Sequence, residues 1–243
     1  MLQRIADSGL PLVPGRTKLA SAEPVVAVVA ARARLVVDTA GRLSVPLGDA
    51  PSSMPADGVP PGWEMKEFVG RAAVGVVPSE IGAVLRLRSE HTSFVIYRDV
   101  VLDAAQFAWL SWMWKVTRLP AGGDVRHAAT DDQAVQVYVA FPRWPAPLAR
   151  SDVIGYVWDT TAPVGTRVTS SKAPNVRILV VQSGTDGLGT WQRQQRNVLQ
   201  DYEALFGHRP PRLGAVAIMI DTDDTGGTAE ALVGALAFSR KPS

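Results

Sequence analysis

Short runs in which apolar and polar residues alternate recur along most of this chain, with turn residues between them. In residues 134–141, the apolar residues Val135, Val137, Val139 and Phe141 occupy every second position. Because successive side chains of a strand point to opposite faces, this parity predicts a strand with one face in a core. Further strands are expected at residues 72–77, 83–88, 93–102, 109–116, 154–158, 177–182, 215–220 and 231–238. This regular spacing is typical of an all-β sandwich or barrel, and we expect a two-sheet antiparallel β-sandwich.

One segment has helical spacing instead of alternation. Its apolar residues recur at intervals of three and four positions: Val198, Leu199, Tyr202, Leu205 and Phe206. This pattern predicts one amphipathic helix at about residues 191–206. Gly207 follows at the position where glycine commonly ends a helix.

The chain is expected to divide into three parts. Residues 1–46 read as an N-terminal extension with short strands, and a hairpin-like turn is expected at residues 38–41. Residues 47–61 form a proline-rich connection, because prolines cannot pair within a central strand. The sandwich domain is expected at residues 62–243.

Composition excludes several classes of protein. The 25 Lys and Arg residues are spread among 23 Asp and Glu residues, and the formal net charge is +2, so no clustered basic patch points to nucleic acid. The longest apolar run, residues 25–31, is too short to span a membrane and is interpreted as a strand, not as a signal peptide. There are no cysteines, which excludes disulfides and thiolate metal sites. Neither nucleotide-binding nor zinc-hydrolase motifs occur, so no organic cofactor is expected.

Several segments, taken in order, resemble a known family. They are GW at 62–63, LSWMWKV at 110–116, LPAGGD at 119–124, DDQAVQVYVAF at 131–141, VVQSG at 180–184, RNVLQDYEALFGHRPPRL at 196–213 and IDTDDTGG at 220–227. In this order they resemble the bacterial domain-of-unknown-function family 3047. The resemblance covers roughly residues 62–239 and implies a jelly roll similar to carbohydrate-binding modules. It also implies export, although no signal peptide is evident, so a cytoplasmic location stays open. No activity comes with the family.

The parity of the strands separates core residues from ligand-binding candidates. Trp112 and Trp114 share one parity and are expected in the core, whereas Met113 faces the other way. Gln136 and Tyr138 likewise face away from the core, on the side where jelly rolls keep a concave ligand surface. The family is expected to carry Arg where this chain has Met113 and Gln136, so that surface is less suited to an acidic ligand.

The leading hypothesis is therefore a non-enzymatic protein that binds a saccharide or another small molecule on the concave face. Aromatic rings at strand positions can stack on sugar rings, and arginine can bind carboxylates or hydroxyl groups in a bidentate manner. The ligand-binding candidates are Met113, Gln136, Tyr138, Tyr156, Trp158 and Arg196. The alternative to ligand binding is partial burial for the aromatic residues and a structural ion pair for Arg196. A structural or interaction protein is a further alternative, and it would show a large exposed apolar patch.

The alternative function is a cofactor-independent lyase, isomerase or cyclase. His127, Asp131 and Asp132 lie just before the strand at 134–141, so they could meet at one rim of the sandwich. Two carboxylates beside an imidazole can split their pKa values, as acid–base catalysis requires. The alternative for this cluster is a solvated loop in which Asp132 makes turn hydrogen bonds.

The segment at 220–227 offers candidate metal ligands. Asp221 and Asp223 follow a predicted strand, and alternate carboxylates are the hard oxygen ligands that Ca²⁺ takes. The spacing does not complete an EF-hand loop. A structural Ca²⁺ is therefore one hypothesis, and carboxylates that cap backbone groups in a tight turn are the other.

Overall fold

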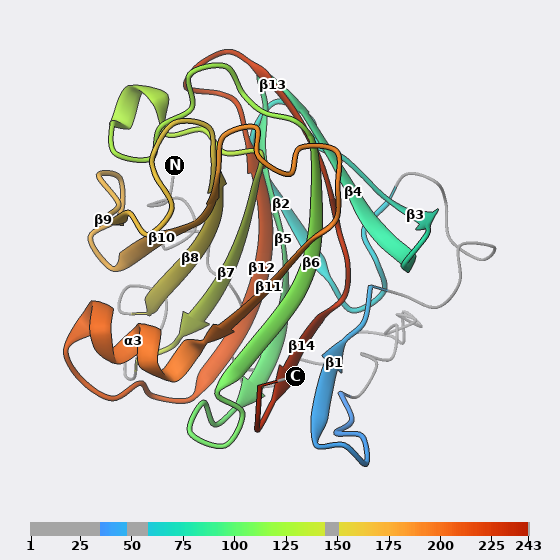
Figure 1. Cartoon of the computed structure of the whole chain (residues 1–243), viewed down its shortest axis with the longest axis vertical. Helices are drawn as coiled ribbons and strands as arrows, with labels where there is room; N and C mark the ends of the chain where they lie inside the picture. Colours follow the sequence, from blue (N-terminus) through green and yellow to red (C-terminus); the bar gives the residue numbers. More distant parts are fainter. Residues whose placement is uncertain (1–34, 48–57, 144–150, 243) are drawn as a thin grey trace, which may run out of the picture.

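Two seven-stranded sheets pack face to face in the computed structural model, which describes residues 35–47, 58–143 and 151–242 (Figure 1). Sheet A contains β1 (Arg42–Val45), β3 (Ala73–Ser79), β4 (Gly82–Glu90), β6 (Trp109–Arg118), β11 (Gln192–Asn197), β13 (Thr228–Val233) and β14 (Leu236–Ser239). Sheet B contains β2 (Glu64–Val69), β5 (Ser93–Leu102), β7 (Val135–Phe141), β8 (Asp152–Asp159), β9 (Arg167–Thr169), β10 (Val176–Ser183) and β12 (Leu213–Asp221). The predicted two-sheet sandwich is confirmed.

Strand pairing shows that the sandwich is a jelly roll. Four antiparallel pairs are nested one inside the next along the chain: β4 with β13, β5 with β12, β6 with β11, and β7 with β8. These pairs lie alternately in sheet A and sheet B, so the chain resembles one long hairpin that has been rolled up. This is the arrangement of a jelly roll. The pairing of β10 with β8 is parallel, which is an exception in a mostly antiparallel sandwich.

Four large aromatic side chains fill the middle of the core. The ring centroids of Trp112 and Trp114 lie 5.3 Å apart, those of Trp112 and Tyr156 5.5 Å, and those of Trp114 and Trp158 6.1 Å. Trp112 is 2% exposed and the other three are fully buried. The predicted core positions of Trp112 and Trp114 are confirmed, because the inner faces of β6 and β8 meet across the sandwich.

One predicted strand is divided into two. The run at residues 231–238 is interrupted between β13 and β14, where the Gly234 amide donates to the Met113 carbonyl at 2.8 Å. β13 and β14 pair with successive parts of the same edge of β6. β11 pairs with the other edge of β6, so β6 lies at the centre of this part of sheet A.

The helix is shorter than the sequence predicts. Residues 192–197 form strand β11, and only α3 (Val198–Phe206) is helical. The polar run QRQQRN contains no apolar period, so nothing in it opposes pairing with the free edge of β6. Asn197 caps the helix by accepting from the Gln200 amide at 3.0 Å, and Gly207 ends it in the left-handed conformation, as predicted. No helix in the described ranges is long and apolar enough to cross a membrane.

Part of the predicted N-terminal extension joins the sandwich. β1 pairs with β14, and the expected turn is present, since the Asp38 carboxylate accepts from the amides of Ala40 and Arg42. The predicted strand at residues 25–31 lies outside the described residues, as does most of the predicted connection at 47–61.

Candidate functional site

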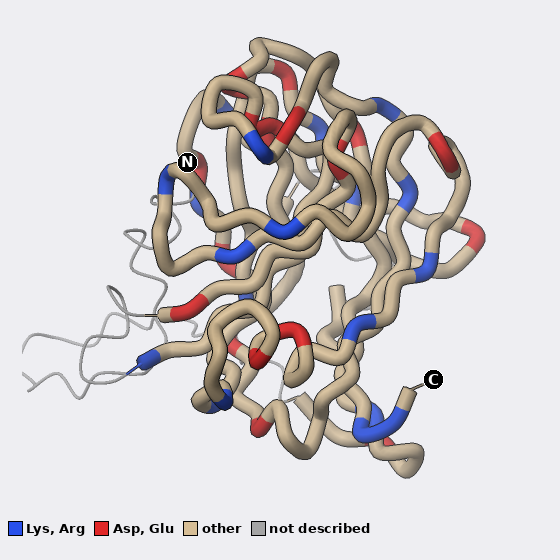
Figure 2. Tube along the Cα trace, turned by 60° about the vertical axis from the view of Figure 1, so that its left-hand side comes forward, with Lys and Arg blue, Asp and Glu red and all other residues tan. Residues whose placement is uncertain are grey.

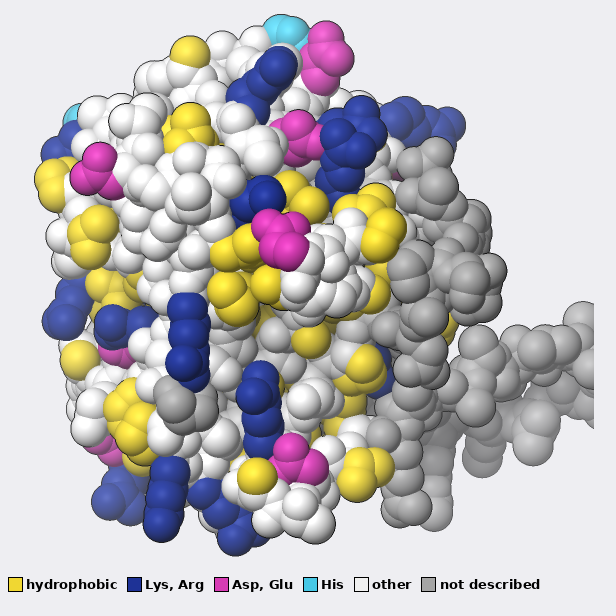
Figure 3. All heavy atoms as spheres, turned by 45° about the vertical axis from the view of Figure 1, so that its right-hand side comes forward, with side chains coloured by type: hydrophobic (Ala, Val, Ile, Leu, Met, Phe, Trp, Pro, Cys, Tyr) yellow, Lys and Arg dark blue, Asp and Glu magenta, His cyan; other side chains and the backbone are white. Residues whose placement is uncertain are grey.

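The outer faces of the two sheets differ in exposure. In sheet B, strands β7, β8 and β12 are buried at every position. Val125, Ala162 and Ala173, which lie on connecting loops, pack into the apolar cluster on that outer face. In sheet A, strands β4, β6 and β13 alternate between buried and more open positions. Sheet A therefore carries the open strand surface, and Figure 3 shows hydrophobic and charged side chains mixed on the side of the molecule where β3 and β4 lie.

Trp191 anchors one part of this surface. It lies just before β11, is half-buried, and its indole N–H donates to the Glu80 carboxylate at 2.6 Å. The same carboxylate oxygen accepts from the Lys115 ammonium at 3.1 Å, and that ammonium lies 5.4 Å from the centre of the Trp191 ring. Hydrogen bonds from the backbone and from Lys115 lower the pKa of Glu80, so this carboxyl group is ionised at neutral pH. The indole is thereby held in a fixed orientation.

A groove of about 460 Å³ lies along β6 and β11. We call it the β6–β11 groove; its lining includes Arg42, Ile81, Ser111, Met113 and Arg193. Met113 pairs with Arg193 across the two strands, so both side chains point to the outer face. The groove combines apolar side chains with guanidinium and hydroxyl donors.

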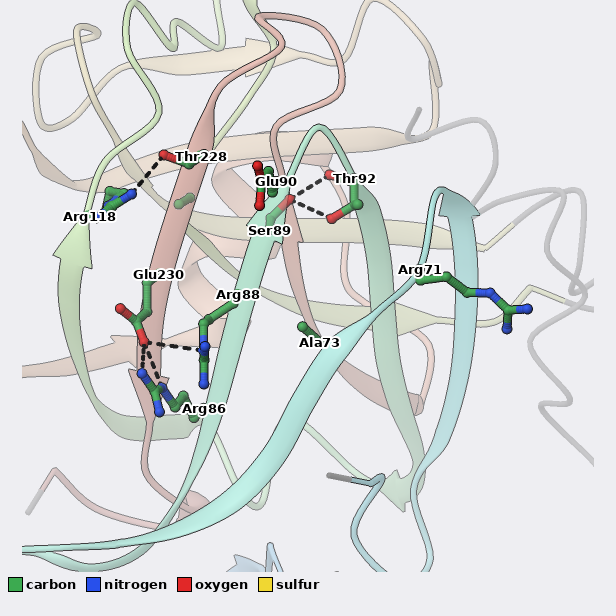
Figure 4. Close-up of a pocket in the computed structure, with 11 residues that line it drawn as sticks. Arg71, Ala73, Arg86, Arg88, Ser89, Glu90, Thr92, Arg118, Thr228 and Glu230 are labelled. Carbon is green, nitrogen blue, oxygen red and sulfur yellow. Dashed lines mark hydrogen bonds and ion pairs between the residues drawn. The ribbon is translucent and has the colours of Figure 1, made fainter. Parts of the chain in front are cut away.

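A second groove, of about 470 Å³, lies over β4 and β13 (Figure 4). Glu230 accepts from Arg86 at 2.6 Å and lies 3.6 Å from the Arg88 guanidinium, whereas Arg118 donates to Thr228. Burial acts to raise the pKa of Glu230, but hydrogen bonds from Arg86 and Thr117 and the nearby guanidinium charges lower it overall. We call this surface the arginine groove.

Gln136 and Tyr138 do not lie on an open surface, contrary to expectation. They face the outer side of sheet B, away from the main core as predicted, but both are buried. The Tyr138 hydroxyl donates to the Gln136 side chain, and burial, followed by the charges of Asp131 and Asp221, raises the pKa of Tyr138. Met113 belongs to sheet A, on the opposite side of the sandwich. The three side chains therefore do not share one face.

Tyr156, Trp158 and Arg196 lie on the inner side of the sandwich. Tyr156 and Trp158 pack in the main core, because β8 pairs with β7 so that they face the same way as Val137 and Val135. Tyr156 donates to Asp201 at 2.9 Å, and Arg196 binds the same carboxylate through two hydrogen bonds of 2.9 and 2.5 Å. Tyr156 and Trp158 are therefore core residues, and Arg196 forms a structural ion pair. None of the three is an open ligand contact.

His127, Asp131 and Asp132 do not form one cluster. The His127 side chain is exposed, whereas Asp131 and Asp132 are 2% and 0% exposed. Burial raises the pKa of Asp131 to about 6, and its carboxylate accepts from Gln133. Asp132 instead accepts hydrogen bonds from Thr225, in the turn after β12.

The turn after β12 brings candidate metal ligands together. Carboxylate oxygens of Asp132, Asp221, Asp223 and Asp224 all lie within 4.8 Å of one another. Asp132, which we expected in an acid–base group, thus joins Asp221 and Asp223, which we expected near a metal. Acidic segments gather at the top of Figure 2, the end of the sandwich at which this turn lies.

Sequence reasoning missed most of the open surface of sheet A. Arg86 and Arg88 share one parity in the strand predicted at 83–88, and this signal could have identified them. The helical pattern places Trp191 at the start of a helix, so its contacts with Lys115 and Glu80 do not follow from the sequence.

The fold and this surface define a jelly-roll sandwich with one open sheet face, on whose grooves arginine side chains outnumber carboxylates. The chain belongs to the DUF3047 family of proteins of unknown function, whose model matches residues 61–237. No curated protein matches the chain.

Solved structures with a similar fold include two modules from Clostridium thermocellum cellulosomal cellulases. The family 11 carbohydrate-binding module has a TM-score of 0.41 and 7% identity, and covers 74% of this chain and 88% of the module. The family 30 module has a TM-score of 0.44 and 9% identity, with coverages of 75% and 93%. The xyloglucanase domain of NopAA from Sinorhizobium fredii has a TM-score of 0.43 and 11% identity, with coverages of 78% and 100%. At such scores the similarity carries no argument about function.

Proposed function

We propose that the protein binds a saccharide on the outer face of sheet A, and that saccharides with carboxylate or sulfate groups are preferred. The observation that carries the proposal is the open face of sheet A, where Trp191 and several arginines lie along adjacent strands. The proposal assigns binding to this face and no catalytic step.

The geometry near Trp191 suits a sugar ring. An indole held by a hydrogen bond offers an apolar surface at low entropic cost, and a pyranose ring presents C–H groups to such a surface. Arg193 lies on the same face of β11, two residues further along, and can donate to hydroxyl or carboxylate oxygens in a bidentate manner. Met113 and Ile81 supply apolar contact beside these donors. Saccharide sites combine these features because sugars have both apolar and hydroxylated faces.

Charge favours an acidic saccharide, contrary to the expectation from Met113, because other cations lie on the same face. Along the β6–β11 groove, the arginine groove and the Trp191 contact, the described side chains include six cations and three anions. The cations are Arg42, Arg86, Arg88, Lys115, Arg118 and Arg193, and the anions are Glu80, Glu90 and Glu230. Arg71 also borders the arginine groove but points away from it in Figure 4, so it is not counted. A surface with this excess attracts anionic chains and binds them more weakly as salt rises.

Arg193→Ala should weaken binding to an acidic polysaccharide by about tenfold, since a charge-assisted hydrogen bond contributes about 1.5–3 kcal/mol. Affinity electrophoresis in native gels that contain alginate measures this change as lost retardation. Gels with hydroxyethyl cellulose test a neutral polysaccharide, for which retardation should be weaker.

Arg209→Ala is the matched control, because the Arg209 side chain is 92% exposed, lies after α3 and carries the same charge. Equal effects of the two variants would show only non-specific attraction to a polyanion and would contradict the proposed site. Retardation of the native protein in neither gel would contradict the proposed function.

The acid–base alternative is not supported by the geometry. It requires His127 beside Asp131 and Asp132, and the structure separates an exposed imidazole from two buried carboxylates.

A further inference from the structure

The four clustered carboxylates come from two segments that are distant in sequence. Asp132 lies just before β7, and Asp221, Asp223 and Asp224 lie at the end of β12 and in the following turn. Because β12 and β7 are antiparallel neighbours, the end of one lies beside the start of the other, and the Asp221 amide donates to the Gln133 carbonyl at 3.2 Å. The strand register therefore fixes this juxtaposition.

Hydrogen bonds satisfy only part of this cluster. Asp132 accepts from the amides of Asp224 and Thr225 and from the Thr225 hydroxyl, at 3.2, 2.6 and 2.5 Å. Asp221 Oδ1 accepts from the Asp223 amide at 3.3 Å. Asp221 Oδ2 and Asp223 Oδ1 are buried and have no hydrogen-bond partner, and Asp221 is fully buried. A buried carboxylate oxygen without a partner is costly, so each such oxygen calls for an explanation.

The charges of the cluster are also unbalanced. Among the described residues, Lys172 is the one cation that forms an ion pair with these carboxylates, and it binds Asp224. Buried like charges repel strongly unless a cation lies between them. One ammonium group at the edge does not reach the unpartnered oxygens of Asp221 and Asp223.

We propose that Asp132, Asp221, Asp223 and Asp224 bind one divalent cation, and that this cation is Ca²⁺. An oxygen-only set of carboxylates is the ligand chemistry of hard cations, and Ca²⁺ accepts irregular sets that water completes, whereas Mg²⁺ demands a nearly octahedral set. The ion would join the segment before β7 to the turn after β12. Lys172 competes with it for Asp224. This role is structural and does not rest on the proposed function, because none of the four carboxylates lines either groove of sheet A.

Thermal unfolding of the full chain in EGTA and in CaCl₂ tests the proposal. At a Ca²⁺ concentration of about 100 times Kd, the melting temperature should rise by about 5–10 °C, because the ion binds the folded state alone. MgCl₂ should produce a smaller rise. Isothermal titration with CaCl₂ should show one site.

Asp221→Asn should abolish both the heat of binding and the rise in melting temperature, yet fold normally in EGTA, since it removes a buried charge and keeps the shape. Asp223→Asn serves as a second variant if the first does not fold. Asp186→Asn is the matched control, because Asp186 is exposed and does not belong to the cluster, and this variant should keep the full response. Equal melting temperatures in EGTA and CaCl₂ for the native chain, or an unchanged response in Asp221→Asn, would overturn the proposal.

Discussion

Trp114→Ala should lower the free energy of unfolding by about 3–5 kcal/mol, which is the range for removing a large aromatic side chain from a packed core. Trp114 is fully buried and packs against Trp112 of the same strand and Trp158 of the facing sheet, so its loss leaves a cavity between the two sheets. A urea denaturation curve monitored by circular dichroism measures this change in free energy. Since single domains are stable by about 5–15 kcal/mol, this variant should unfold at markedly lower urea.

Trp191→Ala is the matched control, because it makes the same substitution at a half-buried position on the open face of sheet A. It should cost no more than about 1–2 kcal/mol, in line with substitutions outside the core. If Trp191→Ala destabilised the chain as much as Trp114→Ala, the distinction between the core face and the open face of sheet A would be wrong.

Asp201→Ala should destabilise the protein by about 3–5 kcal/mol, the range expected when one partner of a buried ion pair is removed. Asp201 is 7% exposed and is bound by both Arg196 and the fully buried Tyr156. The substitution would leave a half-buried guanidinium and a buried hydroxyl group without their acceptor. The hydrogen bond that Arg196 donates to Asp201 raises the pKa of Arg196. A guanidinium also stays protonated without such a partner, so it cannot escape the penalty by losing its charge.

Glu203→Ala, on the same helix, provides the control. Its ion pair with Arg209 is long, at 3.8 Å, and exposed, so its loss should change stability by less than about 0.5 kcal/mol. Chemical denaturation of both variants measures the difference. Similar effects of the two substitutions would contradict the structural role of the Arg196–Asp201 pair.

The sequence predicts much of the sandwich because strand parity is a local property. The alternation in residues 134–141 and the two tryptophans at 112 and 114 identify core faces without any knowledge of neighbouring strands. The predicted helix wrongly includes residues 192–197, since a polar run is compatible with either element and only the free edge of β6 selects the strand. Family resemblance supplied the jelly roll, and the nested pairing of strands confirms it.

The candidate sites depend on information that no local pattern contains. Parity shows that Met113 and Tyr138 face away from the core, but it does not show that they lie on opposite sides of the sandwich. It also does not show that sheet B is buried on its outer side along β7, β8 and β12, because the loops that cover these strands are distant in sequence. Similarly, Asp132 meets Asp221 only through the register of β7 and β12.

The side-chain indole signals of the seven tryptophans provide the most direct test of saccharide binding on sheet A. In a ¹H–¹⁵N correlation spectrum, titration with alginate oligosaccharides should shift the indole signal of Trp191, which the Trp191→Ala variant identifies by its absence. The signals of the buried Trp112, Trp114 and Trp158 should stay in place. A titration that leaves the Trp191 signal unmoved while signals of sheet B shift would contradict the proposed binding face.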